Sequence, residues 1–281
     1  MTNTRNVKVN INIELLSPLA HFGDERMGTM QLMRFHKMRY DEDFIDVPCY
    51  SGNAFRGIFR RRIMRDYLER LGIAEEGISK NLYYMLFTGG ALTSGARFEE
   101  VGERRRIRQM CPPLALLGTA LGNQIPQGKM KSSIFLPVCK ETVEYTGIEE
   151  TLSFYDMLEE VFYTRRDDLK SVDANIKENA KGKENENATQ MKYEMQCLAA
   201  GTKLNGQIVL ENANKIEESC FHAGLDLIKE MPYIGGKSSA GHGKIDIMFD
   251  ELEDVMTYYN YIEENKEEMR KWVREIEEGL K

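Results

Sequence analysis

The first predicted element is a strand, marked by alternating apolar and polar residues. From Val7 to Leu15 every second residue is apolar, which is the pattern of a strand with one buried face. Ser17-Pro18 ends this strand, because the pair favours a turn. The following residues up to Pro48 show no clear period, and we expect them to be irregular.

Apolar residues at helical spacing predict a helix over residues 53–71. Phe55, Phe59 and Ile63 recur at intervals of four and form one stripe. Such a stripe indicates that the helix packs against a core. Four arginines lie largely off this stripe, and we expect them on the exposed face: Arg56, Arg60, Arg61 and Arg65.

The rest of the chain alternates between short strands and helices. The pattern predicts helices at 79–88, 213–229 and 251–278, and strands at 132–139, 191–198, 204–210 and 243–249. Cys111-Pro112-Pro113 breaks any helix within 89–131, and the polar residues 165–190 should be a mobile excursion without a core of their own. The order β–α–β–β–α–β with long insertions predicts an α+β protein with a ferredoxin-like sheet, which RNA-recognition motifs share.

Composition adds that the chain is a soluble, globular protein. Of its 281 residues 42% are hydrophobic and 30% are charged. No apolar run approaches the roughly 20 residues that span a membrane, and the N-terminus lacks the apolar core of a signal peptide. We therefore expect a cytoplasmic protein with no membrane partner. The five cysteines form no Cys-x-x-Cys motif, which predicts reduced, mostly buried thiols.

The net charge of −7 is distributed unevenly. Residues 250–281 hold eleven Asp/Glu and five Lys/Arg, a balance of −6. Residues 97–131, by contrast, hold seven Lys/Arg and three Asp/Glu. Such a basic patch can bind polyanions through its local field, although a run of charge can also be a merely solvated face.

The start of the helix at 53–71 is the first candidate site. Ser51 and Asn53 can cap the helix, and its N-terminus carries unpaired N–H groups and a partial positive charge. Arg56, Arg60 and Arg61 follow within the next turns, where guanidinium groups can bind the same phosphate. The alternative is an ordinary amphipathic helix with a solvated arginine face.

A glycine-rich loop is the second candidate. It includes Gly235, Gly236, Lys237, Ser238 and His242 and directly precedes a predicted strand. Glycine N–H groups in such a loop can cradle a phosphate, although a flexible hairpin is the alternative. The loop is not a Walker motif, because Lys244 is followed by Ile245, and it is not a dinucleotide fingerprint, because no helix follows it.

The third candidate is the run Arg104-Arg105-Arg106-Ile107-Arg108. Four arginines in five residues can contact phosphates without regard to sequence, unless Glu99, Glu100 and Glu103 neutralise them. For catalysis the chain offers little: its four histidines are separated and show no metal-ligand spacing. We therefore expect neither a metal nor a cofactor.

Four segments in the right order resemble the RAMP superfamily of CRISPR-associated proteins, in particular its backbone subunits. Each motif alone is weak, but together they span residues 7–249. They are Leu16-Ser-Pro-Leu-Ala-His-Phe-Gly23, Val47-Pro-Cys-Tyr-Ser-Gly-Asn-Ala-Phe-Arg-Gly-Ile-Phe-Arg60, Cys111-Pro-Pro-Leu-Ala-Leu-Leu-Gly118, and Ala200-Gly-Thr with the glycine-rich loop after Ile234.

The resemblance implies a hand-like protein that coats a guide RNA. It predicts an RRM-like palm over 1–249, with an inserted helical region at about 72–131 and a thumb at about 160–195. Arg165 and Arg166 stand at the base of that thumb, and the acidic C-terminal helix at 250–281 lies outside the match. The partners implied are CRISPR guide RNA, a target DNA or RNA strand paired with it, copies of the chain, and other effector-complex subunits.

One departure from the family bears on catalysis. Target-cleaving members carry an aspartate between the first strand and the first helix, whereas the corresponding residues 31–36 contain no acid. Asp24 or Asp41 could substitute for it. The sequence therefore favours a non-catalytic subunit, with a RAMP ribonuclease or a protein that mimics a backbone subunit as the competing hypotheses.

Overall fold

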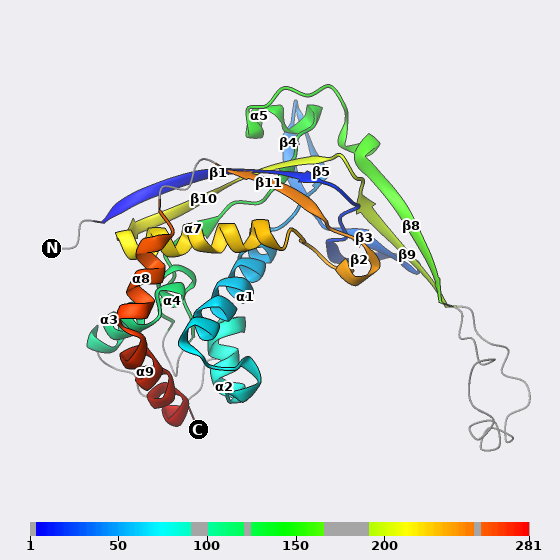
Figure 1. The fold of residues 1–281 in the computed structure, drawn as a ribbon. Helices are drawn as coiled ribbons and strands as arrows, with labels where there is room; N and C mark the ends of the chain where they lie inside the picture. Colours follow the sequence, from blue (N-terminus) through cyan, green and yellow to red (C-terminus); the bar gives the residue numbers. More distant parts are fainter. Residues whose placement is uncertain (1–3, 91–100, 121–124, 166–190, 250–253, 281) are drawn as a thin grey trace, which may run out of the picture.

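The computed structural model describes residues 4–90, 101–120, 125–165, 191–249 and 254–280. A curved sheet lies across the molecule with helices below it, and a long hairpin projects away at one end (Figure 1). Most of the buried apolar side chains, from both sheet and helices, form one continuous core cluster.

The central sheet, which we call the palm, is antiparallel throughout. Its strands run in the order β11-β1-β10-β6, and β7 also lies beside β10. Strand β1 (Arg5–Leu15) therefore lies between β11 (Ile245–Phe249) and β10 (Lys203–Ala213). Two long helices, α1 and α7, complete a β–α–β–β–α–β order and confirm the predicted ferredoxin-like α+β fold. The elements are β1 (Arg5–Leu15), α1 (Gly52–Leu71), β6 (Met130–Ser132), β7 (Leu136–Pro137), β10 (Lys203–Ala213), α7 (Lys215–Glu230) and β11 (Ile245–Phe249).

Strand β1 has the predicted alternation of buried and outward-facing residues. Val9, Ile11, Ile13 and Leu15 are buried towards the helices. On the other face amides pair across the strands: Asn205 donates to Asn12 at 2.8 Å and Gln207 to Asn10 at 3.0 Å. The second palm strand is shorter than expected, because Phe135 leaves β10 and pairs with Tyr50 instead. This splits the predicted strand 132–139 into β6 and β7.

The two long helices form where capping residues allow them to begin. Ser51 caps α1, and Gly72 ends it in the left-handed region at φ 68°. Asn214 and Glu217 form a capping box at the start of α7. The helices then pack closely, since a Cβ on Gly224 would lie 2.3 Å from the ring of Phe59.

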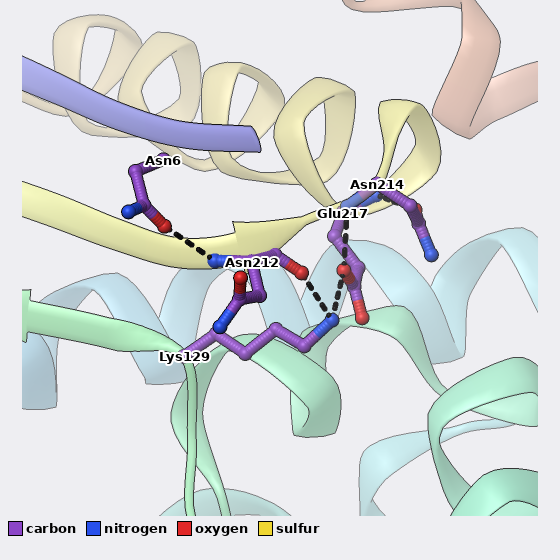
Figure 2. Close-up of polar contacts among 5 residues, drawn as sticks. All are labelled: Asn6, Lys129, Asn212, Asn214 and Glu217. Atoms are coloured by element: carbon purple, nitrogen blue, oxygen red, sulfur yellow. Dashed lines mark hydrogen bonds and ion pairs between the residues drawn. The ribbon is translucent and has the colours of Figure 1, made fainter. Parts of the chain in front are cut away.

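Lys129 joins the second strand of the palm to the start of α7 (Figure 2). Its Nζ donates to the carbonyl of Asn212 at 2.8 Å and to Glu217 at 2.6 Å. Asn212 has a left-handed backbone at φ 50°, and its N–H donates to the side chain of Asn6. The Lys129–Glu217 pair therefore fixes the sharp turn between β10 and α7.

Short helices follow α1 and cover its far end. The expected helix at 79–88 is present as one α turn that continues as a π turn, and Pro112 starts a new helix where we expected only a break. The elements are η1 (Glu75–Gly77), α2 (Lys80–Tyr83), η2 (Tyr84–Thr88), α3 (Val101–Met110) and α4 (Pro112–Leu117).

The expectation of an irregular chain up to Pro48 is wrong. The segment forms four short strands, of which β4 and β5 make a separate hairpin. Strands β2 and β3 join β9 (Met191–Leu198) and β8 (Leu158–Arg165) in a second sheet of order β2-β3-β9-β8. These strands escaped prediction because they are largely exposed and carry few alternating apolar residues. Their bounds are β2 (Phe22–Met27), β3 (Met30–Met33), β4 (Phe35–Tyr40) and β5 (Asp43–Pro48).

The projecting hairpin, which we call the thumb hairpin, consists of β8 (Leu158–Arg165) and β9 (Met191–Leu198). Its place matches the expected excursion, whose residues 166–190 lie outside the described part of the chain. The segment between β7 and β8 contains η3 (Lys140–Thr142), α5 (Val143–Thr146) and η4 (Phe154–Met157).

The C-terminal segment forms two helices where we expected one. They are α8 (Met256–Glu264) and α9 (Lys266–Gly279), which meet at Asn265. Although the segment is acidic, Tyr258, Ile262 and Trp272 are buried in the same core cluster as the palm. The acidic helices are therefore an integral part of the fold.

Candidate nucleic-acid interface

The glycine-rich loop is fixed at both of its ends. The N–H groups of Gly236 and Gly243 each donate to a carbonyl of residues 18–20 at 2.8 Å. A Cβ on Gly243 would lie 1.9 Å from the carbonyl oxygen of Ile234, so only glycine fits there. Between these ends Lys237 has a left-handed backbone and leads into the exposed turn η6 (Ser238–Ala240). The loop is thus held at both ends, and an exposed turn projects between them.

His242 joins this loop to the thumb hairpin. Its side chain is only 3% exposed: Nδ1–H donates to the carbonyl of Pro18 at 3.1 Å, and Nε2 accepts from the hydroxyl of Tyr163. Tyr193 stands opposite Tyr163 in the hairpin, and Lys237 Nζ lies 5.8 Å from its ring centre. His242 therefore positions the loop and is not itself exposed to a ligand.

A groove lies between the loop and helix α1. Its polar lining comes from α1, from the segment that follows α7 and from the loop: Arg61, Arg62, Arg65, Tyr233, Ser238 and Ser239. Arg62 donates to the carbonyl of Leu227 at 2.8 Å, and Arg65 binds Glu75 at 2.8 Å. Arg61 is exposed and pairs with no carboxylate among the described residues. A free guanidinium beside two hydroxyls and an aromatic ring suits a sugar-phosphate backbone.

The first turn of α1 is packed against its surroundings. Ser51 Oγ accepts from the N–H of Ala54 at 3.2 Å, and a Cβ on Gly52 would lie 2.4 Å from the carbonyl oxygen of Ser133. The N–H of Ser51 donates to His21 Nε2 at 3.2 Å, so His21 is neutral. Burial, with a contribution from Arg34, lowers the pKa of His21 to about 4. Of the two expected site residues in this turn, only Asn53 is exposed.

Arg56 and Arg60 point away from the groove, so the expectation that Arg60 is exposed is wrong. Arg60 is 9% exposed and donates to the carbonyls of Leu86, Leu117 and Gly118 at 2.9–3.1 Å. Arg56 donates to Leu117 as well, at 3.0 Å. Burial lowers the pKa of Arg60 to about 10, and the positive charge of Arg56 adds to the effect. Both arginines hold the inserted helical segments against α1.

The remaining candidates lie elsewhere. Arg104 and Arg106 belong to α3, on the helix side of the palm, and Arg106 binds Glu275 at 2.7 Å. Arg165 ends β8 in the thumb hairpin, and Arg166 lies outside the described residues. The structure therefore brings Arg61, Gly235 and Ser238 into one groove, with Gly236 and Lys237 in the same loop, and separates the arginines of α3 from them.

The two aspartates considered for catalysis occupy different hairpins. Asp24 lies in β2, whereas Asp41 lies in the turn between β4 and β5 at φ 53°. Within the described ranges, no group of three His, Cys, Asp or Glu side chains is placed to hold a metal ion. Neither aspartate is thus part of an assembled acidic centre there.

Several groove and loop residues were not predicted. Arg62, Arg65, Tyr233 and Ser239 line the groove, and Tyr193 faces Lys237 across the loop. Tyr193 lies opposite Tyr163 because of the register in which β8 pairs with β9. These two tyrosines are far apart in the sequence, since residues 166–190 lie between the strands. The sequence predicted a strand at 191–198, but a strand pattern alone does not specify which strand pairs with it or in which register.

Sequence comparisons identify no relative: no protein-family model and no curated protein matches the chain. Among the helices that the structure describes, none is long and apolar enough to cross a membrane.

The fold, by contrast, is shared with one chain of a known assembly. A chain of a solved Type IV-B CRISPR complex superimposes with a TM-score of 0.65 over 88% of this chain and 92% of that chain. The two sequences are 20% identical. At that identity the likeness establishes a common fold.

Proposed function

We propose that this protein is a CRISPR effector subunit that binds guide RNA in the groove between α1 and the glycine-rich loop. The observation that carries the proposal is Arg61, an exposed guanidinium without a carboxylate partner among the described residues, which lines one groove with Ser238 of the glycine-rich loop. The shared fold with a chain of a Type IV-B CRISPR complex supports the assembly context. The guide so held would pair with a target DNA or RNA strand in the cytoplasm.

The thumb hairpin extends the binding surface beyond the groove. Lys237, on the loop, lies between the groove and the aromatic pair Tyr163 and Tyr193. Aromatic rings next to cationic side chains are typical of surfaces that bind single strands without base specificity, because every base can stack. We therefore place the RNA path along the groove and across the base of the thumb hairpin.

The test removes Arg61 and Lys237, two cations of this path that form no ion pair among the described residues. Arg61→Ala with Lys237→Ala should lower affinity for a short single-stranded RNA about tenfold and reduce the salt slope by about 0.7 for each phosphate that is no longer neutralised. Lys271→Ala with Arg274→Ala is the matched control, because it removes the same charge from an exposed face of α9. Fluorescence anisotropy at several salt concentrations measures both quantities. Equal losses in the two double variants would refute the proposed path.

Coating of a guide RNA predicts a stoichiometry that grows with RNA length. Light scattering of complexes on RNAs of increasing length should show one added subunit per fixed increment. A single subunit on every RNA would contradict the backbone role and favour a ribonuclease or a mimic of the backbone subunit. Cleavage of the RNA that is lost in Asp24→Asn or Asp41→Asn would favour the ribonuclease.

A further inference from the structure

The β4–β5 hairpin and the segment around α5 lie on the side of the palm opposite α1 and α7 and form a surface feature there (Figure 1). It consists of the tip of the β4–β5 hairpin, residues 40–44, and the segment 144–156, and we call it the acidic ridge. The hydroxyl of Tyr145 donates to the carbonyl of Arg39 at 3.0 Å and ties the two parts together. Phe44 and Tyr155 are each 69% exposed, and three further apolar side chains of the segment 144–156 are exposed: Tyr145, Ile148 and Leu152.

The charge of this ridge disfavours RNA as its ligand. Residues 40–44 and 144–156 contain no Lys or Arg, exposed Arg39 lies at their edge, and the exposed acids include Asp41, Glu42, Asp43, Glu144, Glu149 and Asp156. A phosphate backbone would be repelled by these carboxylates. Large exposed apolar side chains that gather in one place instead mark a protein–protein contact. The carboxylates require that the partner surface be basic.

A surface of that chemistry lies on the other side of the same molecule. Helix α3 presents exposed Arg105 and Arg108 at the rim of a pocket whose apolar lining includes Pro112, Ile216 and Tyr261. Arg106, on the same helix, is bound to Glu275, but Arg105 and Arg108 pair with no carboxylate within the described chain. We call this surface the arginine pocket.

We propose that the acidic ridge of one copy docks into the arginine pocket of the next copy. The tip Asp43-Phe44 offers carboxylate and aromatic groups together, which guanidinium groups bind by charge-assisted hydrogen bonds and by cation–π contact. The two surfaces lie on opposite sides of the palm, so they cannot meet within one copy (Figure 1). Such a contact is heterologous and repeats from copy to copy. The inference rests on the proposed function, because a repeating contact is what a subunit that coats RNA needs.

Charge reversal tests the contact from both sides. Glu42→Lys with Asp43→Lys reverses the ridge, and Arg105→Glu with Arg108→Glu reverses the pocket. Each double variant should weaken assembly on a long RNA at least about tenfold, because like charges then face one another. The fourfold variant should restore assembly, because the reversed ridge meets a reversed pocket. Light scattering measures the number of copies per RNA.

A short RNA that holds one subunit separates this inference from the proposed function. The ridge and pocket variants should bind it with unchanged affinity. Loss of that binding in the pocket variant, without rescue in the fourfold variant, would assign α3 to RNA and overturn the docking. Full assembly of the ridge variant would overturn it too and assign the ridge to another effector subunit. If wild-type protein does not bind the short RNA, it is the proposed function that fails.

Disulfide trapping gives a readout that needs no RNA. Phe44→Cys with Gln109→Cys places one thiol on the ridge and one at the rim of the pocket. The five native cysteines are buried, which keeps the background low. Oxidation should produce a ladder of linked multimers, whereas either single variant should give none. Absence of a ladder both with and without RNA would overturn the docking.

Discussion

Helices α1 and α3 are both rich in arginine, yet they use it in different ways. In α1, Arg60 is buried against three backbone carbonyls, and its neighbour Arg61 faces the groove. In α3, Arg105 and Arg108 are exposed, whereas Ile107 and Met110 anchor the helix in the core. The comparison shows that the number of arginines in a helix does not predict how many of them can contact a ligand. An arginine is accessible only where no neighbouring segment covers its guanidinium group.

Removal of Arg60 should give the largest effect. Arg60→Ala leaves buried carbonyls without donors and opens a cavity between α1 and α4, so we expect a loss of about 3 kcal/mol in the free energy of unfolding. Arg61→Ala, one residue away, should change stability by no more than about 0.5 kcal/mol. Urea denaturation measures both values. Comparable losses of unfolding free energy in the two variants would show that the buried and the exposed arginine do not differ in their contribution to stability.

His21, at the start of α1, should make the free energy of unfolding depend on pH. The folded-state pKa of His21 lies below its ordinary value of 6.5, at about 4, so the unfolded chain binds the proton more readily. The contribution of His21 is therefore present above pH 6.5 and is lost as the pH falls from 6.5 to about 4. Allowing for its partial exposure, we expect about 1 kcal/mol.

A variant isolates this contribution from the titration of carboxylates. His21→Gln keeps an acceptor for the N–H of Ser51 but cannot be protonated in this range. The difference in unfolding free energy between the two proteins should therefore change between pH 6.5 and 4. NMR titration of the imidazole measures the pKa directly, and an ordinary value near 6.5 would count against a neutral, buried His21.

Arg106 should give the smallest effect. Its ion pair with Glu275 joins α3 to α9 at 2.7 Å, but both side chains are more than a third exposed. Exposed pairs contribute little, so Arg106→Ala should cost about 0.5 kcal/mol and leave binding of a short RNA unchanged. A double-mutant cycle with Glu275→Ala checks the pair. A loss as large as that of Arg60→Ala would mean that α3 depends on its arginines in the same way as α1.

The sequence by itself determined the elements whose patterns are local. Alternation placed β1, helical spacing placed α1 and α7, and the order of elements predicted the ferredoxin-like palm. The clustered glycines of the loop correctly predicted backbone conformations that other residues rarely adopt. Gly243, for example, has a positive φ of 74°. In each case neighbouring residues alone specify the outcome, since period and backbone freedom are properties of a short segment.

Only the tertiary structure decided which residues meet. Arg60 lies one helical step from exposed Arg61, and it is buried because residues 86–90 and 117–118 fold across that flank of α1. The strands β2 to β5 form through pairing with distant or weakly patterned segments, which no local period reveals. The acidic helices α8 and α9 join the core through Tyr258 and Trp272, and the sequence did not show which elements they pack against. Burial depends on what packs against a surface, and that partner lies far away in the chain.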